Sequence, residues 1–95
     1  MKNPARHNVA SLEDLPNICP VMARALRLLD IQAPQQLKGN DAYQMHSDLC
    51  KITGQQQDPC VIEVFLAAID FMEGGKAAPW WDFTEERKKY LPREI

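Results

Sequence analysis

A nine-residue stretch that contains two prolines, from Leu15 to Ala23, constrains the fold of this chain more than any other feature. Pro16 ends a short helix that Ser11 can cap, and Pro20 suits the first turn of a new helix. Only a tight turn fits between them. Apolar residues recur on both sides of this turn at spacings that place them on facing sides of two helices: Leu12, Leu15, Ile18, Ala23 and Leu26. The sequence therefore predicts two short helices that join at a hairpin and pack through this apolar frame.

The spacing is that of a helix-hairpin-helix unit. In proteins that carry the unit, the turn reads glycine, apolar, glycine, and its backbone N–H groups face a nucleic-acid phosphate at a helix N-terminus. Asn17 stands at the first glycine position, where it is the best non-glycine residue for a left-handed backbone. At the second position Cys19 places a side chain where a phosphate oxygen would approach, Pro20 offers no N–H, and Val21 brings no charge. The turn predicts the helix packing together with a weakened phosphate contact.

Length and composition indicate one soluble domain. Ninety-five residues, 45% of them hydrophobic and 25% charged, match an ordinary globular protein. No apolar run reaches the roughly 18 residues of a membrane span, and the first residues lack the apolar stretch of a signal peptide. Three cysteines at irregular spacing suit a reducing compartment. We expect a cytoplasmic protein with a flexible tail over residues 1–10 and a single helical domain over residues 11–95.

Periodicity and capping signals predict helices along nearly the whole chain. Asn40 is expected to cap a helix that stops at Gly54, and the Asp58–Pro59 pair opens a helix that is apolar on nearly all sides and so central. Pro92 forbids continuation of the C-terminal helix beyond about residue 91. The expected helices cover residues 11–15, 20–31, 40–54, 59–74 and 84–91, and residues 33–39 are expected to form a single helical turn that proline starts and glycine ends. The predicted fold class is all-α, a compact bundle of five to six short helices.

The charge balance bears on partners. A formal net charge of −2 has the wrong sign for a protein that binds phosphate backbones. Basic residues nevertheless gather after the turn and near the C-terminus, namely Arg24, Arg27, Arg87, Lys88, Lys89 and Arg93. Acidic neighbours are interleaved with them, so solvated helix faces are the simpler interpretation.

Three blocks of the sequence resemble a known family. The first block is residues 12–26. The middle block comprises Leu49, Cys50, Gly54 and residues 58–65. The last block comprises residues 79–81, Phe83, Thr84, Arg87 and Lys88. The chain is similar to the bacterial family of pathogenicity-locus and mitomycin resistance proteins, described as helix-hairpin-helix domain proteins, and more distantly to the C-terminal domain of the competence regulator TfoX. The resemblance implies a compact, SAM-like helical domain that binds nucleic acid or acts in DNA repair or regulation, without catalytic residues. The chain departs from the family pattern at Cys19 and Val21.

Other reactive side chains admit two interpretations. His46 and Cys50 have the spacing of two zinc ligands on one helix, with Cys60 as a third, but a zinc site needs four ligands, and packing explains the residues as well. Cys60 lies near a helix N-terminus that can lower the pKa of a thiol, or it is a small buried hydrophobe. No residue pair predicts nucleophilic catalysis, and no metal, cofactor or small-molecule substrate is expected.

The adjacent tryptophans have two interpretations: Trp80 and Trp81 stack on unpaired bases of a nucleic acid, or they pack on the hydrophobic core and close it. We expect packing, with one ring inside and the other partly exposed, where it would suit a homodimer interface.

Two functional classes follow from the sequence. One is a nonenzymatic module that binds DNA weakly and without sequence preference. Its site would comprise Asn17, Ile18, Cys19, Val21 and Arg24, with Arg27, Arg87 and Lys88 as auxiliary charges. The other is a protein interaction or assembly module in which the hairpin is only a packing element.

Overall fold

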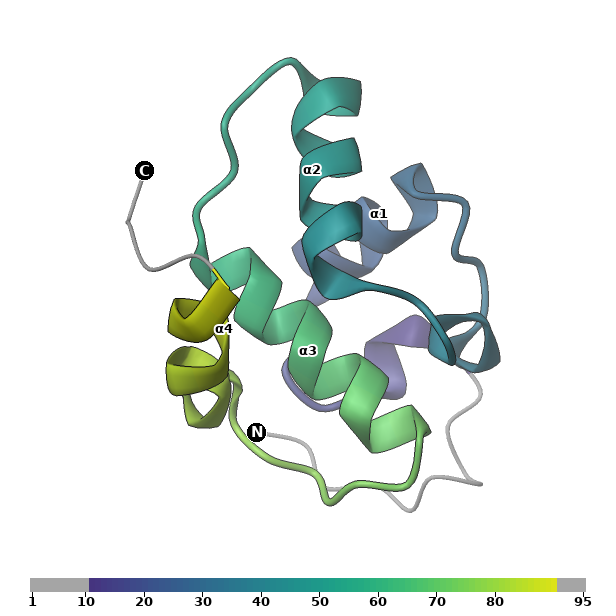
Figure 1. The fold of residues 1–95 in the computed structure, drawn as a ribbon. Helices are drawn as coiled ribbons and strands as arrows, with labels where there is room; N and C mark the ends of the chain where they lie inside the picture. Colours follow the sequence, from purple (N-terminus) through teal and green to yellow (C-terminus); the bar gives the residue numbers. More distant parts are fainter. Residues whose placement is uncertain (1–10, 91–95) are drawn as a thin grey trace.

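The computed structural model describes residues 11–90, with side chains as far as residue 88, and this part of the chain is all-helical without a strand. It contains four α-helices: α1 (Pro20–Leu28), α2 (Ala42–Thr53), α3 (Cys60–Met72) and α4 (Thr84–Tyr90). It also contains three 3-10 turns: η2 (Leu12–Asp14) before α1, η3 (Pro34–Leu37) between α1 and α2, and η4 (Trp80–Phe83) between α3 and α4. Figure 1 shows α3 crossing the centre, with α4 on one side and α1 and α2 on the other. The all-α prediction is confirmed.

The number of α-helices differs from the five to six that we expected. The short helix predicted over residues 11–15 forms only a 3-10 turn of three residues, and the single helical turn predicted over residues 33–39 is a 3-10 turn of four residues. Pro16 and Gly39 leave too few residues for a second turn of α-helix, since forming the first turn is the costly step. The predicted tail over residues 1–10 and the predicted end of the C-terminal helix lie outside the described residues.

The central position predicted for α3 is confirmed. Most of its side chains are buried, including Ile62 and Phe65 at 0% exposure. It contacts α2, η3, η4 and α4, so these four elements pack directly against it, whereas α1 packs against α2 and η2. One of its buried residues is charged, Glu63, whose partner is described below.

The ends of α2 show where capping prediction succeeded and failed. Asp41, not Asn40, caps the helix, because its carboxylate accepts hydrogen bonds from the backbone N–H groups of Tyr43 and Gln44. The Asn40 side chain instead donates to the Gln36 carbonyl. Gly54 ends the helix in the left-handed conformation, at φ 69°, as expected.

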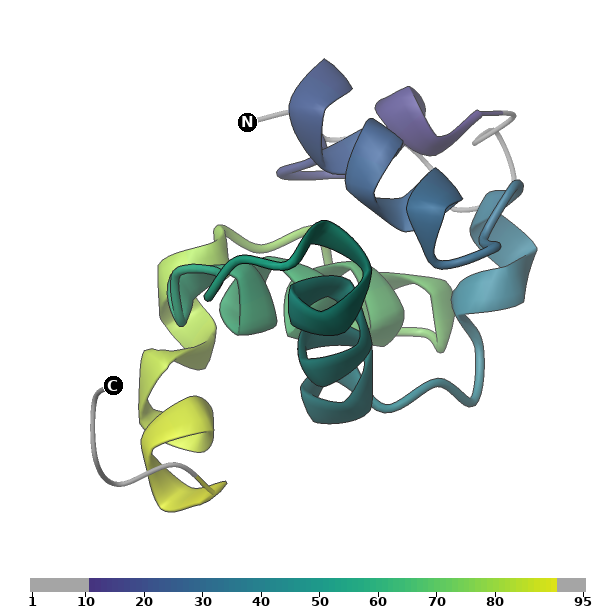
Figure 2. The ribbon, with the colours of Figure 1, turned by 90° about the horizontal axis from the view of Figure 1, so that it is seen from above.

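The segment around the first turn packs through the predicted apolar frame. Its five residues are between 0% and 2% exposed: Leu12, Leu15, Ile18, Ala23 and Leu26. Figure 2 shows η2 and α1 side by side at one edge of the molecule. The frame therefore attaches this pair of elements to the common core, although the first of them is a 3-10 turn rather than an α-helix.

Candidate nucleic-acid interface

Asn17 has the left-handed backbone that the glycine position requires. Its φ of 68° confirms the prediction. The side-chain amide Nδ2 donates a 2.7 Å hydrogen bond to the carbonyl oxygen of Ala78, in the segment that leads into η4. Asparagine therefore adopts the backbone conformation that glycine would adopt here, and its side chain adds a hydrogen bond that glycine cannot make. This hydrogen bond connects the turn to a residue 61 positions further along the chain.

The surface after Asn17 belongs to the start of α1. Cys19, Pro20 and Val21 are exposed, and Val21 reaches 68%. Cys19 is the N-cap residue and its side chain makes no capping hydrogen bond, while its carbonyl accepts from the N–H of Ala23 at 2.9 Å. The backbone N–H groups of Val21 and Met22 precede that first helical bond, so helix geometry offers them no acceptor within α1. The helix dipole also favours an anion at this end, where the first turn has no acidic residue.

Ile18 takes part in the turn differently from the neighbouring residues. Its side chain is buried, at 2% exposure, and its N–H donates to the Leu15 carbonyl at 3.3 Å. Ile18 therefore holds the turn in shape and does not present a group to a phosphate.

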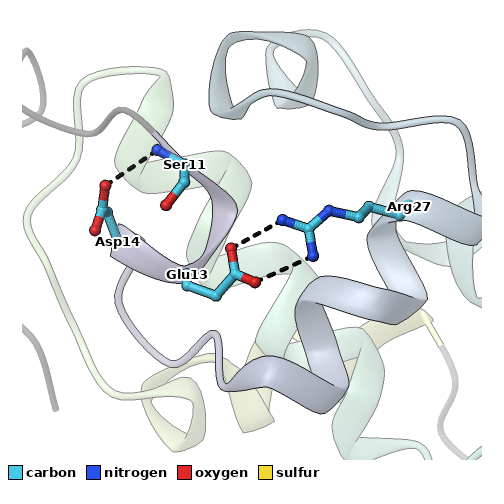
Figure 3. Close-up of polar contacts among 4 residues, drawn as sticks. All are labelled: Ser11, Glu13, Asp14 and Arg27. Atoms are coloured by element: carbon cyan, nitrogen blue, oxygen red, sulfur yellow. Dashed lines mark hydrogen bonds and ion pairs between the residues drawn. The ribbon is translucent and has the colours of Figure 1, made fainter.

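The two arginines of α1 differ in their surroundings. Arg24 is exposed on the helix turn that follows Val21. Arg27 forms a bidentate ion pair across the hairpin with Glu13 on η2, at 2.9 and 3.1 Å (Figure 3). The hydrogen bonds that Arg27 donates to Glu13 raise the pKa of the Arg27 guanidinium, desolvation lowers it, and the negative charge of Glu13 raises it further. Arg27 is thus paired with Glu13 at the surface, whereas Arg24 is the exposed arginine that is closer in sequence to the turn.

Arg87 is not a surface charge. Its side chain is 6% exposed and its Nε donates a 2.7 Å hydrogen bond to the carboxylate of Glu63, which is 2% exposed. The pair joins α4 to α3. Our expectation of Arg87 as an auxiliary cation is corrected, because a phosphate cannot reach a guanidinium in this position. Lys88, next to it, is exposed. Glu63, which has apolar residues on both sides in the most apolar helix, was the sequence signal for a buried cation.

The tryptophan pair divides as predicted. Trp80 is partly buried against the core, and Trp81 is 59% exposed. Their ring centroids lie 5.5 Å apart with planes at 83°, an edge-to-face contact. The packing interpretation is confirmed for Trp80, and Trp81 is left at the surface close to the segment that Asn17 contacts.

His46, Cys50 and Cys60 do not form a common centre. His46 contacts the Gln57 carbonyl through Nε2 at 3.0 Å, and Cys50 Sγ accepts from the Gln57 N–H at 3.3 Å, so both side chains hold the loop between α2 and α3. Among the residues that the structure describes, no three His, Cys, Asp or Glu side chains gather to hold a metal ion.

The thiol of Cys60 is less acidic than an ordinary cysteine. Burial raises its pKa, and the neighbouring Asp58 carboxylate raises it further. This corrects the interpretation of Cys60 as a thiolate activated by a helix N-terminus. Asp58 accepts from the Cys60 backbone N–H at 3.1 Å, and this bond lowers the pKa of Asp58.

Comparison with known proteins places the chain in a family. The family model described as "Pathogenicity locus" matches residues 5–89, and the chain belongs to this family. The chain is also 33% identical over 85 residues to the "Mitomycin resistance protein McrB" of Streptomyces lavendulae, an alignment that covers 90% of this chain and 81% of that protein. No solved structure matches the chain. In the described part, no helix combines the length and apolar character needed to cross a bilayer.

Proposed function

We propose that this protein is a nonenzymatic helix-hairpin-helix module that binds DNA weakly and without sequence preference through the start of α1. The contact surface consists of Asn17, Cys19 and Val21 with Arg24 beside them. Lys88 contributes at most long-range charge. A role in DNA repair or regulation, in the cytoplasm, accords with the family and with a relative named for mitomycin resistance.

The observation that carries the proposal is the left-handed Asn17 directly before an exposed helix N-terminus. Asn17 has a φ of 68°, and the start of α1 that follows it is exposed at Cys19, Pro20 and Val21, while the apolar frame is buried. Backbone N–H groups at such an end bind phosphate without reading the base sequence. Arg24, on the next turn, supplies the cation that such a contact needs.

The same residues explain why binding should be weak. Pro20 removes one N–H, and the exposed side chain of Cys19 stands beside the approach to the others. Arg27 is engaged by Glu13 and Arg87 by Glu63, so two of the predicted auxiliary charges are offset. With a net charge of −2 for the whole chain, little long-range attraction remains.

The proposal is tested by titrating labelled duplex and single-stranded DNA at low salt with the natural chain and a Cys19→Gly, Val21→Lys variant. We expect weak binding by the natural chain and tighter binding by the variant, which regains one close approach and one charge. Binding by the variant alone would show that the natural turn has lost the function. If neither protein binds, the proposal is rejected.

The second candidate is a protein interaction module. It is favoured by the ion pair between Glu13 and Arg27, which fixes the two sides of the hairpin to each other as a packing element would. It is also favoured by Trp81, whose exposed ring suits a protein contact. Light scattering coupled to size exclusion tests it, and a monomer at all concentrations would count against a homodimer.

A further inference from the structure

The ion pair between Glu13 and Arg27 lies at the surface, unlike the pair between Glu63 and Arg87. The side chain of Glu13 is 37% exposed and that of Arg27 is 42% exposed. Water and dissolved ions reach both groups, and a pair of this kind contributes little net stability because solvent competes for each partner. Arg27 can therefore exchange Glu13 for another anion at low cost.

The geometry of the pair is one that a phosphate can reproduce. The Arg27 nitrogens Nη1 and Nη2 each donate to a different oxygen of the Glu13 carboxylate, at 3.1 and 2.9 Å (Figure 3). A phosphodiester also offers two charged oxygens, and a guanidinium binds carboxylates and phosphates in the same bidentate manner. Glu13 thus occupies the donors that a backbone phosphate would use.

Arg27 also continues the surface proposed for DNA binding. Val21, Arg24 and Arg27 are all exposed and follow one another at intervals of three residues on α1, so each is a surface neighbour of the next. Each step along this row rises about 4.5 Å along the helix. Arg27 is therefore the next cation after Arg24 on the helix whose start would hold a phosphate.

We propose that Glu13 is an internal competitor of DNA, which occupies Arg27 in the free protein and is displaced by a backbone phosphate on binding. This inference rests on the proposed binding at the start of α1. In the exchange, Arg27 replaces one bidentate anion by another, and the released Glu13 carboxylate attracts a cation from solution. In the natural chain Arg27 therefore adds little to the affinity or to its salt dependence.

The two acids of η2 have different roles, so the competitor can be removed selectively. The Asp14 carboxylate accepts a 3.0 Å hydrogen bond from the backbone N–H of Ser11 and so stabilises the 3-10 turn, whereas Glu13 points across the hairpin to Arg27 (Figure 3). Glu13→Gln keeps the shape of the side chain and removes its charge. Arg27 then becomes available as a full phosphate contact.

The test is fluorescence anisotropy with a labelled duplex over a range of salt concentrations. It compares the natural chain, Glu13→Gln, Arg27→Gln and the double variant. Glu85→Gln is the matched control, because it removes the charge of an exposed acid on α4, which lies across α3 from α1 (Figure 1). Arg27→Gln breaks the same ion pair as Glu13→Gln, so it controls for any effect of the lost pair on the fold.

We expect Glu13→Gln to bind at least about threefold more tightly than Glu85→Gln at low salt, with a slope of log K against log salt that is steeper by about one. Arg27→Gln should bind almost as well as the natural chain. Adding Arg27→Gln to Glu13→Gln should remove both gains, because the gains require the released guanidinium.

Two results would overturn the inference while the proposed function stands. One is an equal gain in affinity for Glu13→Gln and Glu85→Gln, which is the effect of net charge alone. The other is a gain that persists in the double variant, which Arg27 cannot produce. If none of the proteins binds DNA, the proposed function itself is rejected, and the inference with it.

Discussion

The buried ion pair between Glu63 and Arg87 should behave as a unit. The two side chains are 2% and 6% exposed and lie 2.7 Å apart, so water cannot replace either partner. Arg87→Met keeps an unbranched apolar stem but removes the guanidinium, so it leaves the Glu63 carboxylate buried without its cation. Loss of one partner from a buried pair costs about 3–5 kcal/mol of unfolding free energy.

That loss is large for a chain of this size. A total stability of about 5–14 kcal/mol is usual for 95 residues, so the variant retains little of it at the low end. At about 4–8 °C per kcal/mol for small domains, the melting temperature should fall by roughly 12–40 °C. Replacing both residues, as Glu63→Met with Arg87→Met, removes the unpaired charge together with the pair and should recover most of the loss.

Urea unfolding followed by tryptophan fluorescence measures all four proteins of this double-mutant cycle. We expect the double variant to be more stable than the Arg87→Met variant. The reasoning is refuted if Arg87→Met costs less than about 1 kcal/mol, as an exposed pair would. It is equally refuted if the loss of unfolding free energy in the double variant equals the sum of the losses in the two single variants.

Three further predictions concern the turn and the loop before α3. Asn17→Gly keeps the left-handed backbone but loses the hydrogen bond to Ala78, whereas Asn17→Ala loses the same bond and adds about 1 kcal/mol or more of backbone strain. Urea unfolding should therefore show a smaller loss of unfolding free energy for Asn17→Gly, and equal losses would contradict this. Because the pKa of Asp58 is lowered in the folded state, its carboxylate stabilises the fold above the ordinary pKa of 3.8, and this stabilisation is lost as the pH falls through the lowered pKa. Asp58→Asn should therefore reduce the loss of unfolding free energy at acidic pH. An unchanged loss would exclude Asp58 as its cause. Because burial raises the pKa of Cys60, iodoacetamide at pH 8 should label the exposed Cys19 well before Cys60. Peptide mass spectrometry of a labelling time course measures both rates, and faster labelling of Cys60 would contradict its burial.

Local signals in the sequence predicted most of the fold. Prolines and glycines act on the few residues beside them, so the start of α1 and the end of α2 at Gly54 follow from residue type alone. The left-handed Asn17 was predicted for the same reason. The N-cap of α2 was not predicted correctly. Either the Asn40 or the Asp41 side chain can accept hydrogen bonds from the first N–H groups of α2, and the preceding 3-10 turn decides which side chain is placed to do so.

Contacts between distant residues account for what the sequence could not predict. The partner of Asn17 is 61 residues away, and the partner of Glu63 is 24 residues away. Arg87 was interpreted as a surface charge because its own helix is polar, and only the packing of α4 on α3 buries it. The surface hollow lined by Leu28 and Ile52 likewise exists only where the end of α1 meets the second half of α2.

The salt dependence of DNA binding at the turn tests the central claim most directly. Fluorescence anisotropy with a labelled duplex gives the binding constant of the natural chain, of Arg24→Gln and of Lys38→Gln, a matched control at an exposed lysine after η3. If Arg24 contacts a phosphate beside the N-terminus of α1, the slope of log K against log salt should fall by about one for Arg24→Gln alone. Equal effects of the two substitutions, or no binding by the natural chain at the lowest salt, would contradict the account.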